Sequence, residues 1–184
     1  PAFFQDTNTF NWDRARLFRL YTDSQVDIQK VSFMWRSALG GLKTGEVVRR
    51  YNIPGARCNC VFCGEKDLET VEHLFFKCPA LGAIRATAIR YFEKFDLLVP
   101  CSDEDALRLL FILGLTSTSE SRSKARNIFN VSSEYCYAIW QARNDVLFRY
   151  KILGHDTIDK ISHVLRCRCD TLYSDSLRIP HDIF

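Results

Sequence analysis

The sequence lacks the features that would place it in a membrane, secreted or strongly charged class. No apolar run approaches the roughly 18–20 residues that a membrane-spanning helix needs, so no membrane partner is expected. The first residues, Pro1 to Asp6, carry neither the basic nor the apolar segment of a secretory signal peptide. Net charge is only +3, which is compatible with nucleic-acid binding without requiring it. The absence of an initiator methionine favours an excised piece of a longer polypeptide.

Cysteine and histidine are few and unevenly placed. The chain has 4 histidines and 8 cysteines among its 184 residues. Cysteine is thus about 4 % of the residues, well below the roughly 8–10 % found in disulfide scaffolds. Three cysteines and one histidine nevertheless lie within the short segment Cys60–Cys78. This clustering favours reduced thiols and a metal site in a reducing compartment, so a nuclear or cytoplasmic location is expected.

The first half of the cysteine-rich segment predicts a zinc knuckle. Cys60 and Cys63 are separated by two residues, which lets both thiolates bind one ion while the intervening amides turn toward the sulfurs. Gly64 follows directly and supplies the backbone angles that such a turn needs. Cys58 could replace Cys60, although its spacing to Cys63 makes a poorer knuckle. Residues 57–62 are expected to form a short hairpin.

The second half of the segment predicts a helical return of two further ligands. Thr70 can cap a helix that places His73 in its first turn and Cys78 near its end. Four protein ligands leave no open coordination position, so the expected cofactor is a structural Zn²⁺ whose binding contributes folding energy. The predicted ligands are Cys60, Cys63, His73 and Cys78.

Most periodic segments outside the knuckle predict helices. The predicted class is therefore mostly α, a helical domain with a small inserted Cys3His zinc knuckle. The longest expected helix runs from Ser119 to about Lys151, with apolar residues at three-to-four spacing. Three segments are expected to form one compact unit: an N-terminal helical segment (1–56), a zinc-binding module (57–98) and a C-terminal helical segment (99–184). The other expected helices cover 14–21, Asp23 or Ser24 to Gly40, a short run after Thr44, Pro79 to Phe92, Ser102 to Gly114, and Asp156 to before Pro180.

Several groups of residues occur together in a recognisable order. They are Phe33–Gly45 with its Trp35, then Arg49–Ile53, then Cys60-x2-Cys63-Gly followed by Glu69–Pro79. Together they resemble the zinc-binding region that follows the reverse transcriptase domain of non-LTR, LINE-type retrotransposons. Further along, Trp140-x-x-Arg143-Asn144 resembles a segment found downstream in many of these elements. The resemblance implies a noncatalytic C-terminal module of a retrotransposon polyprotein that helps position RNA or DNA in target-primed reverse transcription.

Basic residues near the knuckle and on the long helix are the candidates for contact with RNA or DNA. The knuckle itself carries mostly acidic side chains, which would repel a polyanion, so its flanks are expected to make the contacts. On the long helix, aromatic neighbours would allow base stacking, although a solvated basic face over core aromatics is the alternative there. Arg143 and Asn144 could instead order a buried helix junction. The candidates are Arg49, Arg50, Arg57, Lys77, Arg85, Arg143, Asn144 and Arg149.

No convergent acid, base and nucleophile predicts catalysis by this chain alone. The segments 21–24 and 173–176 echo a polymerase motif, but each lacks the second aspartate that two-metal chemistry needs. At His163, Cys167 and Cys169, buried thiols are expected rather than a second metal site. The alternative function is a domesticated, retrotransposon-derived scaffold or protein-interaction subunit, which the aromatic content of 13 % favours.

Overall fold

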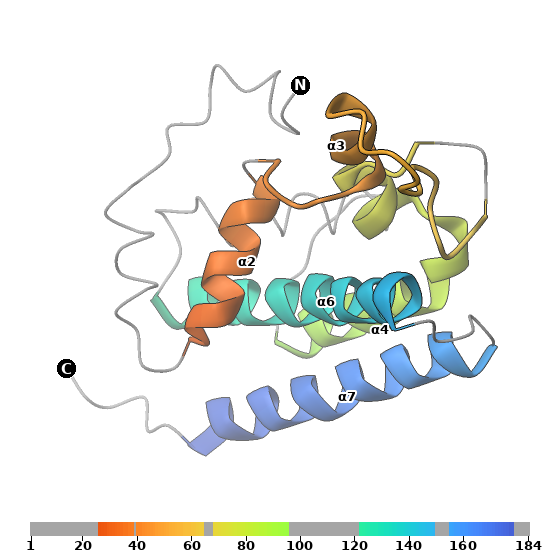
Figure 1. The fold of residues 1–184 in the computed structure, drawn as a ribbon. Coiled ribbons are helices and arrows are strands. Elements are labelled where there is room, and N and C mark those ends of the chain that lie inside the picture. Colours follow the sequence, from red (N-terminus) through yellow and green to blue (C-terminus); the bar gives the residue numbers. More distant parts are fainter. Residues whose placement is uncertain (1–25, 39, 65–67, 96–121, 150–154, 179–184) are drawn as a thin grey trace.

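The computed structural model describes residues 26–38, 40–64, 68–95, 122–149 and 155–178 (Figure 1). The described residues form helices and no strand, which confirms the predicted mostly α class. None of the described helices is both long enough and apolar enough to cross a membrane. The elements are α2 (Ile28–Ala38), α3 (Gly45–Arg50), a π-helical turn η1 (His73–Lys77), a 3-10 turn η2 (Pro79–Leu81), α4 (Gly82–Lys94), α6 (Arg122–Phe148) and α7 (His155–Arg178).

Helix α6 is the centre of the fold. It packs against α2, α4 and α7, and α4 also packs against α7 (Figure 1). With neighbours on several sides, α6 buries nearly every side chain from Ile128 to Ile139, polar ones included. One apolar cluster extends from Val26 to Cys169 and draws on all three segments expected from the sequence.

The helices that fall within the described residues follow the sequence pattern. The long predicted helix is α6, and Gly40, with a φ of 68°, follows α2 where a stop was expected. Asp156, the expected cap of the last helix, lies instead within the first turn of α7, which begins at His155. The helices expected over 14–21 and from Ser102 to Gly114 lie outside the described residues, as do the caps expected at Asp23 and Ser24.

Two local expectations are wrong. Residues 57–62 do not pair with one another. Instead, a single antiparallel bridge joins Asn59 to Leu68 across the cysteine turn. Thr44 does occupy the N-cap of α3, but its side chain makes no capping hydrogen bond and its buried hydroxyl has no partner. The missing cap has a tertiary replacement, because a distant carboxylate accepts from the first amide of α3, as described below.

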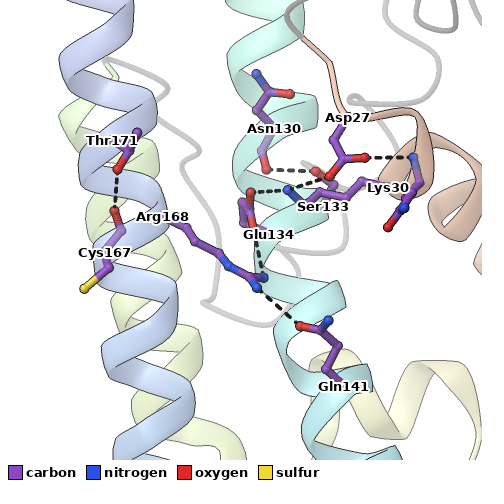
Figure 2. A network of polar contacts seen from close by, with 10 residues as sticks. Asp27, Lys30, Asn130, Ser133, Glu134, Gln141, Cys167, Arg168 and Thr171 are labelled. Carbon is purple, nitrogen blue, oxygen red and sulfur yellow. Dashed lines mark hydrogen bonds and ion pairs between the residues drawn. The ribbon is translucent and has the colours of Figure 1, made fainter.

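A buried carboxylate joins three helices (Figure 2). Glu134 of α6 is 5 % exposed, and it pairs with Lys30 of α2 and with Arg168 of α7, the latter at 3.3 Å. Lys30 also reaches Asp27 at 3.3 Å, and Arg168 donates to Gln141 at 3.4 Å. Figure 2 shows both cations directed at Glu134 from opposite sides. The network therefore orients α2 and α7 on α6.

Glu134→Gln should lower the free energy of unfolding by about 2 kcal/mol, because two cations would face a buried neutral amide. Denaturant unfolding of the zinc-loaded protein measures the change. Asp159→Asn is the matched control, since Asp159 is an exposed carboxylate of α7 without an ion pair among the described residues. Equal stability of Glu134→Gln and the control would show that the network contributes nothing.

Candidate metal centre

The cysteine turn has the local geometry of a metal knuckle. Cys60 and Cys63 lie at its two ends, and the Gly64 amide donates to the Cys60 carbonyl at 3.3 Å. Gly64 has a φ of 66°, a conformation that glycine adopts without steric cost. Besides the hydrogen bond with Cys78, the backbone of Cys63 and Phe62 lowers the pKa of Cys60, as expected of a turn that stabilises a thiolate.

The other two candidate ligands come from a capped π-helical turn. The amide of His73 donates to the Thr70 hydroxyl at 2.9 Å, so Thr70 caps this turn as predicted. The Cys78 amide then donates to the His73 carbonyl, five residues back, at 2.7 Å. In a regular α-helix, residues five apart diverge by about 140° around the axis. The π-turn, which replaces the predicted α-helix, brings His73 and Cys78 onto one side.

The four ligand atoms fit a tetrahedral zinc ion. They all lie within 4.8 Å of one another, with 3.8 Å between the Cys60 and Cys78 sulfurs and 3.4 Å between Cys63 Sγ and His73 Nε2. Zinc–ligand bonds of about 2.0–2.3 Å in a tetrahedron place neighbouring ligand atoms about 3.4–3.8 Å apart. Among the described residues this is the one cluster of three or more candidate ligands.

The electrostatics of the paired sulfurs also fit a cation. Cys60 and Cys78 are both fully buried. A hydrogen bond between them lowers the pKa of Cys60 to about 4 and raises the pKa of Cys78 far above its usual range. Because two buried thiolates repel each other, only one ionises without a counter-charge. A divalent ion between them would permit both thiolates, which is the state zinc requires.

Cys58, the sequence alternative to Cys60, lies outside the cluster. Its thiol is 3.9 Å from the Ala56 carbonyl. Its backbone has a structural role, because the Cys58 carbonyl accepts from the Glu69 amide at 2.9 Å. A Cβ on Gly45 would come within 1.8 Å of that carbonyl oxygen, so only glycine permits this contact between α3 and the knuckle.

A buried ion pair ties the knuckle to α6. Glu69 is 1 % exposed and Arg143 is 2 % exposed. One oxygen of Glu69 accepts from Arg143 Nε at 2.8 Å, from Arg143 Nη2 at 2.5 Å and from the Gly45 amide at 3.1 Å. Arg143 also donates to the Lys43 carbonyl at 3.2 Å and stacks over Trp140 at 4.7 Å. Three segments that are far apart in sequence therefore meet at one carboxylate, a role that sequence reasoning did not assign to Glu69.

Two of the residues predicted to contact nucleic acid are instead inside the protein. Arg143 is held in the ion pair with Glu69, and Arg85 is buried with its guanidinium donating to the Cys78 carbonyl at 2.6 Å. The sequence pattern could not separate these two from surface arginines, because burial of a charged side chain depends on a distant partner. Both arginines position the metal centre.

The remaining candidates lie nearer the surface. Arg49 and Arg50 are exposed on α3, and Arg50 pairs with Glu46 at 3.0 Å. Exposed Arg57 donates to the Cys60 carbonyl at 3.4 Å, and Asn144 is half-buried. Lys77 and Arg149 are exposed within local ion pairs with Glu72 and Asp145, each at 2.9 Å.

One exposed aromatic residue, Tyr51, was not among the predicted contacts with RNA or DNA. Tyr51 directly follows Arg49 and Arg50 and is 70 % exposed. The adjoining Pro54-Gly55 loop signal could have indicated that this tyrosine is not a core residue.

The last helix does not assemble a second cluster of three ligands. The Cys167 sulfur lies 3.6 Å from His163 Nε2, but both residues are exposed, so the expectation of a buried thiol is wrong for Cys167. It holds for Cys169, whose burial raises its pKa to about 12.

A comparison with known protein families agrees with this geometry. Residues 3–84 match the sequence model of a family described as zinc-binding in reverse transcriptase. Searches of curated proteins and of solved structures returned no match. The matched range holds all four candidate ligands and Glu69, but it ends before Arg143.

Cys63→Ser should abolish metal binding, whereas Cys58→Ser should retain it, because only Cys63 belongs to the cluster. Native mass spectrometry should find one zinc per chain in the wild type and in Cys58→Ser. Chelation should also reduce helicity, since metal binding of about 10–16 kcal/mol in comparable sites is coupled to folding. A metal-free wild type, or loss of zinc in both variants, would contradict the ligand set.

Arg143→Ala should lower the free energy of unfolding by about 3–5 kcal/mol, because it leaves Glu69 buried and unpaired. In a Glu69→Gln background, Arg143→Ala should lower the free energy of unfolding by much less, and a double-mutant cycle measures this difference. Zinc affinity, read by chelator competition, should fall in Arg143→Ala because Glu69 adjoins the capping Thr70. Additive effects of the two substitutions would contradict a coupled pair.

Proposed function

We propose that the chain is a noncatalytic nucleic-acid-binding module, because residues 3–84 match a family described as zinc-binding in reverse transcriptase. It belongs to the C-terminal part of a LINE-type reverse transcriptase and helps position RNA or DNA in target-primed reverse transcription. The matched family is one of zinc binding rather than catalysis, which supports a module without its own enzymatic activity.

The zinc in this proposal is structural. Cys60, Cys63, His73 and Cys78 supply a complete tetrahedral set, so no position remains for water or substrate. The ion cross-links the cysteine turn to the π-turn, which is followed by the 3-10 turn and α4. Its contribution to function is to hold the flanking segments in place.

The observation that carries the nucleic-acid proposal is an exposed aromatic side chain among arginines. Tyr51 is 70 % exposed and follows Arg49 and Arg50, and the same loop continues to exposed Arg57 beside the knuckle. Arg49 makes no ion pair with any described residue, so its charge is available to a ligand. Arginines that contact phosphates around an aromatic ring that stacks on a base are the usual components of a single-strand binding surface.

Short single-stranded RNA and DNA should bind the zinc-loaded protein, with affinity that falls steeply as salt rises. Tyr51→Ala should weaken binding by about 1–3 kcal/mol, the range for loss of one stacked base. Arg49→Gln should lower the slope of log affinity against log salt by about 0.7, the value for one lost phosphate contact on a single strand. Fluorescence anisotropy at several salt concentrations measures both effects.

Arg36→Gln is the control for this experiment, because Arg36 is an exposed arginine of α2 that donates only to the Ser32 carbonyl at 3.3 Å. It should leave the slope unchanged. Absence of binding at low and moderate salt would reject the proposal. A salt-insensitive complex with a protein partner would instead favour the scaffold alternative.

A further inference from the structure

The seam between α4 and α7 contains a small cavity. Its volume is about 190 Å³, and its lining comes from three successive turns of α4 and one residue of α7. The Tyr91 hydroxyl donates across the seam to the Arg166 carbonyl at 3.2 Å, which fixes the two helices at this point. The lining residues are Thr87, Arg90, Tyr91, Lys94 and Arg166.

The cavity brings three cationic side chains together with one nearby carboxylate. Lys94 is compensated, because it pairs with Asp170 at 3.1 Å and lies 4.3 Å from the centre of the Tyr173 ring. That hydrogen bond, aided by the charge of Arg166, lowers the pKa of Asp170. Arg90 and Arg166 form no ion pair with any described residue. Two guanidinium groups that lack an ion pair with the described residues lie beside one cavity, which favours occupation by an anion.

Thr87 positions one of these cations. Its side chain is 4 % exposed, and its hydroxyl donates to the Ala83 carbonyl at 2.9 Å. The hydroxyl oxygen then accepts from Arg90 Nη2 at 3.2 Å, which holds the guanidinium beside the cavity. The remaining N–H groups of Arg90 are left for a ligand, and a guanidinium matches the paired oxygens of a phosphate.

The cavity is large enough for an anion. Its volume of about 190 Å³ far exceeds the roughly 30 Å³ that one water occupies, so a tetrahedral oxyanion fits. Since its lining offers two guanidinium groups and one ammonium group, the part of a nucleic acid that suits it is a phosphate group rather than a nucleobase.

We propose that Arg90, Arg166 and Lys94 form an oxyanion site that binds a backbone phosphate of single-stranded nucleic acid. The proposal rests on the proposed function, because that function supplies the phosphodiester. It adds a second contact region to the one around Tyr51. Helix α4 follows the 3-10 turn that begins after Cys78, and Arg85 of α4 bonds to the Cys78 carbonyl. The metal centre thus fixes the helix that presents Arg90.

The test compares two double variants that remove the same charge. Arg90→Gln/Arg166→Gln removes the site, and Arg36→Gln/Lys160→Gln removes two exposed cations elsewhere. Zinc content and helicity should be unchanged in both. In a first arm, inorganic phosphate should raise the melting temperature of the wild type and of the control variant, but not that of the site variant.

In a second arm, the site variant should bind single-stranded RNA with a salt slope lowered by about 0.7–1.4, corresponding to one or two lost phosphate contacts. The control variant should keep the wild-type slope. Equal responses of both variants in both arms would overturn the site. A response to phosphate alone, with an unchanged RNA slope, would overturn the nucleic-acid assignment while leaving the surface around Tyr51 intact. A wild type that binds phosphate but no RNA would reject the proposed function separately from the anion site.

Discussion

The arrangement of this protein depends on one buried carboxylate and its arginine partner. Glu69 accepts from Gly45 at the start of α3 and from Arg143 in α6, and both members of the ion pair are almost fully enclosed. A buried charge without its partner costs several kcal/mol, so the three segments that meet here have few alternative arrangements. The pair also explains why Thr44 can begin α3 without a side-chain cap, since Glu69 supplies the acceptor instead.

The metal centre is continuous with the helical core rather than an independent loop. Next to Glu69, Thr70 caps the turn that presents His73. Within that turn, the Phe75 carbonyl accepts from the buried hydroxyl of Tyr135 in α6. Residues 135 and 143 lie beyond the range that matches the zinc-binding family, so the structural unit that holds the ligands is larger than the matched sequence. A metal ion held by the four ligands and the packing of α6 would thus support the same short segment.

Burial divides the basic residues into two functional groups. Arg85 and Arg143 are enclosed and bond to backbone or carboxylate oxygens near the metal centre, so they serve the fold. Arg49 and Arg57 are exposed near Tyr51, and Arg90 and Arg166 line the α4–α7 cavity, so their charges face solvent. The enclosed arginines hold the surfaces on which the exposed ones lie. Under the proposed function, a substitution in either group weakens ligand binding, but only one in the enclosed group also lowers stability.

The sequence by itself determined the helical class, the long helix and the four clustered ligands, because these follow from local periodicity and from cysteine spacing. It did not determine the π-turn, the bridge between Asn59 and Leu68, or which arginines are buried. Those features arise from contacts between residues far apart in the chain. The spacing of Arg143 within its helix is compatible with either a solvent-facing or an enclosed position. Only the presence of Glu69 beside it, brought there by the tertiary structure, decides that its charge is internal.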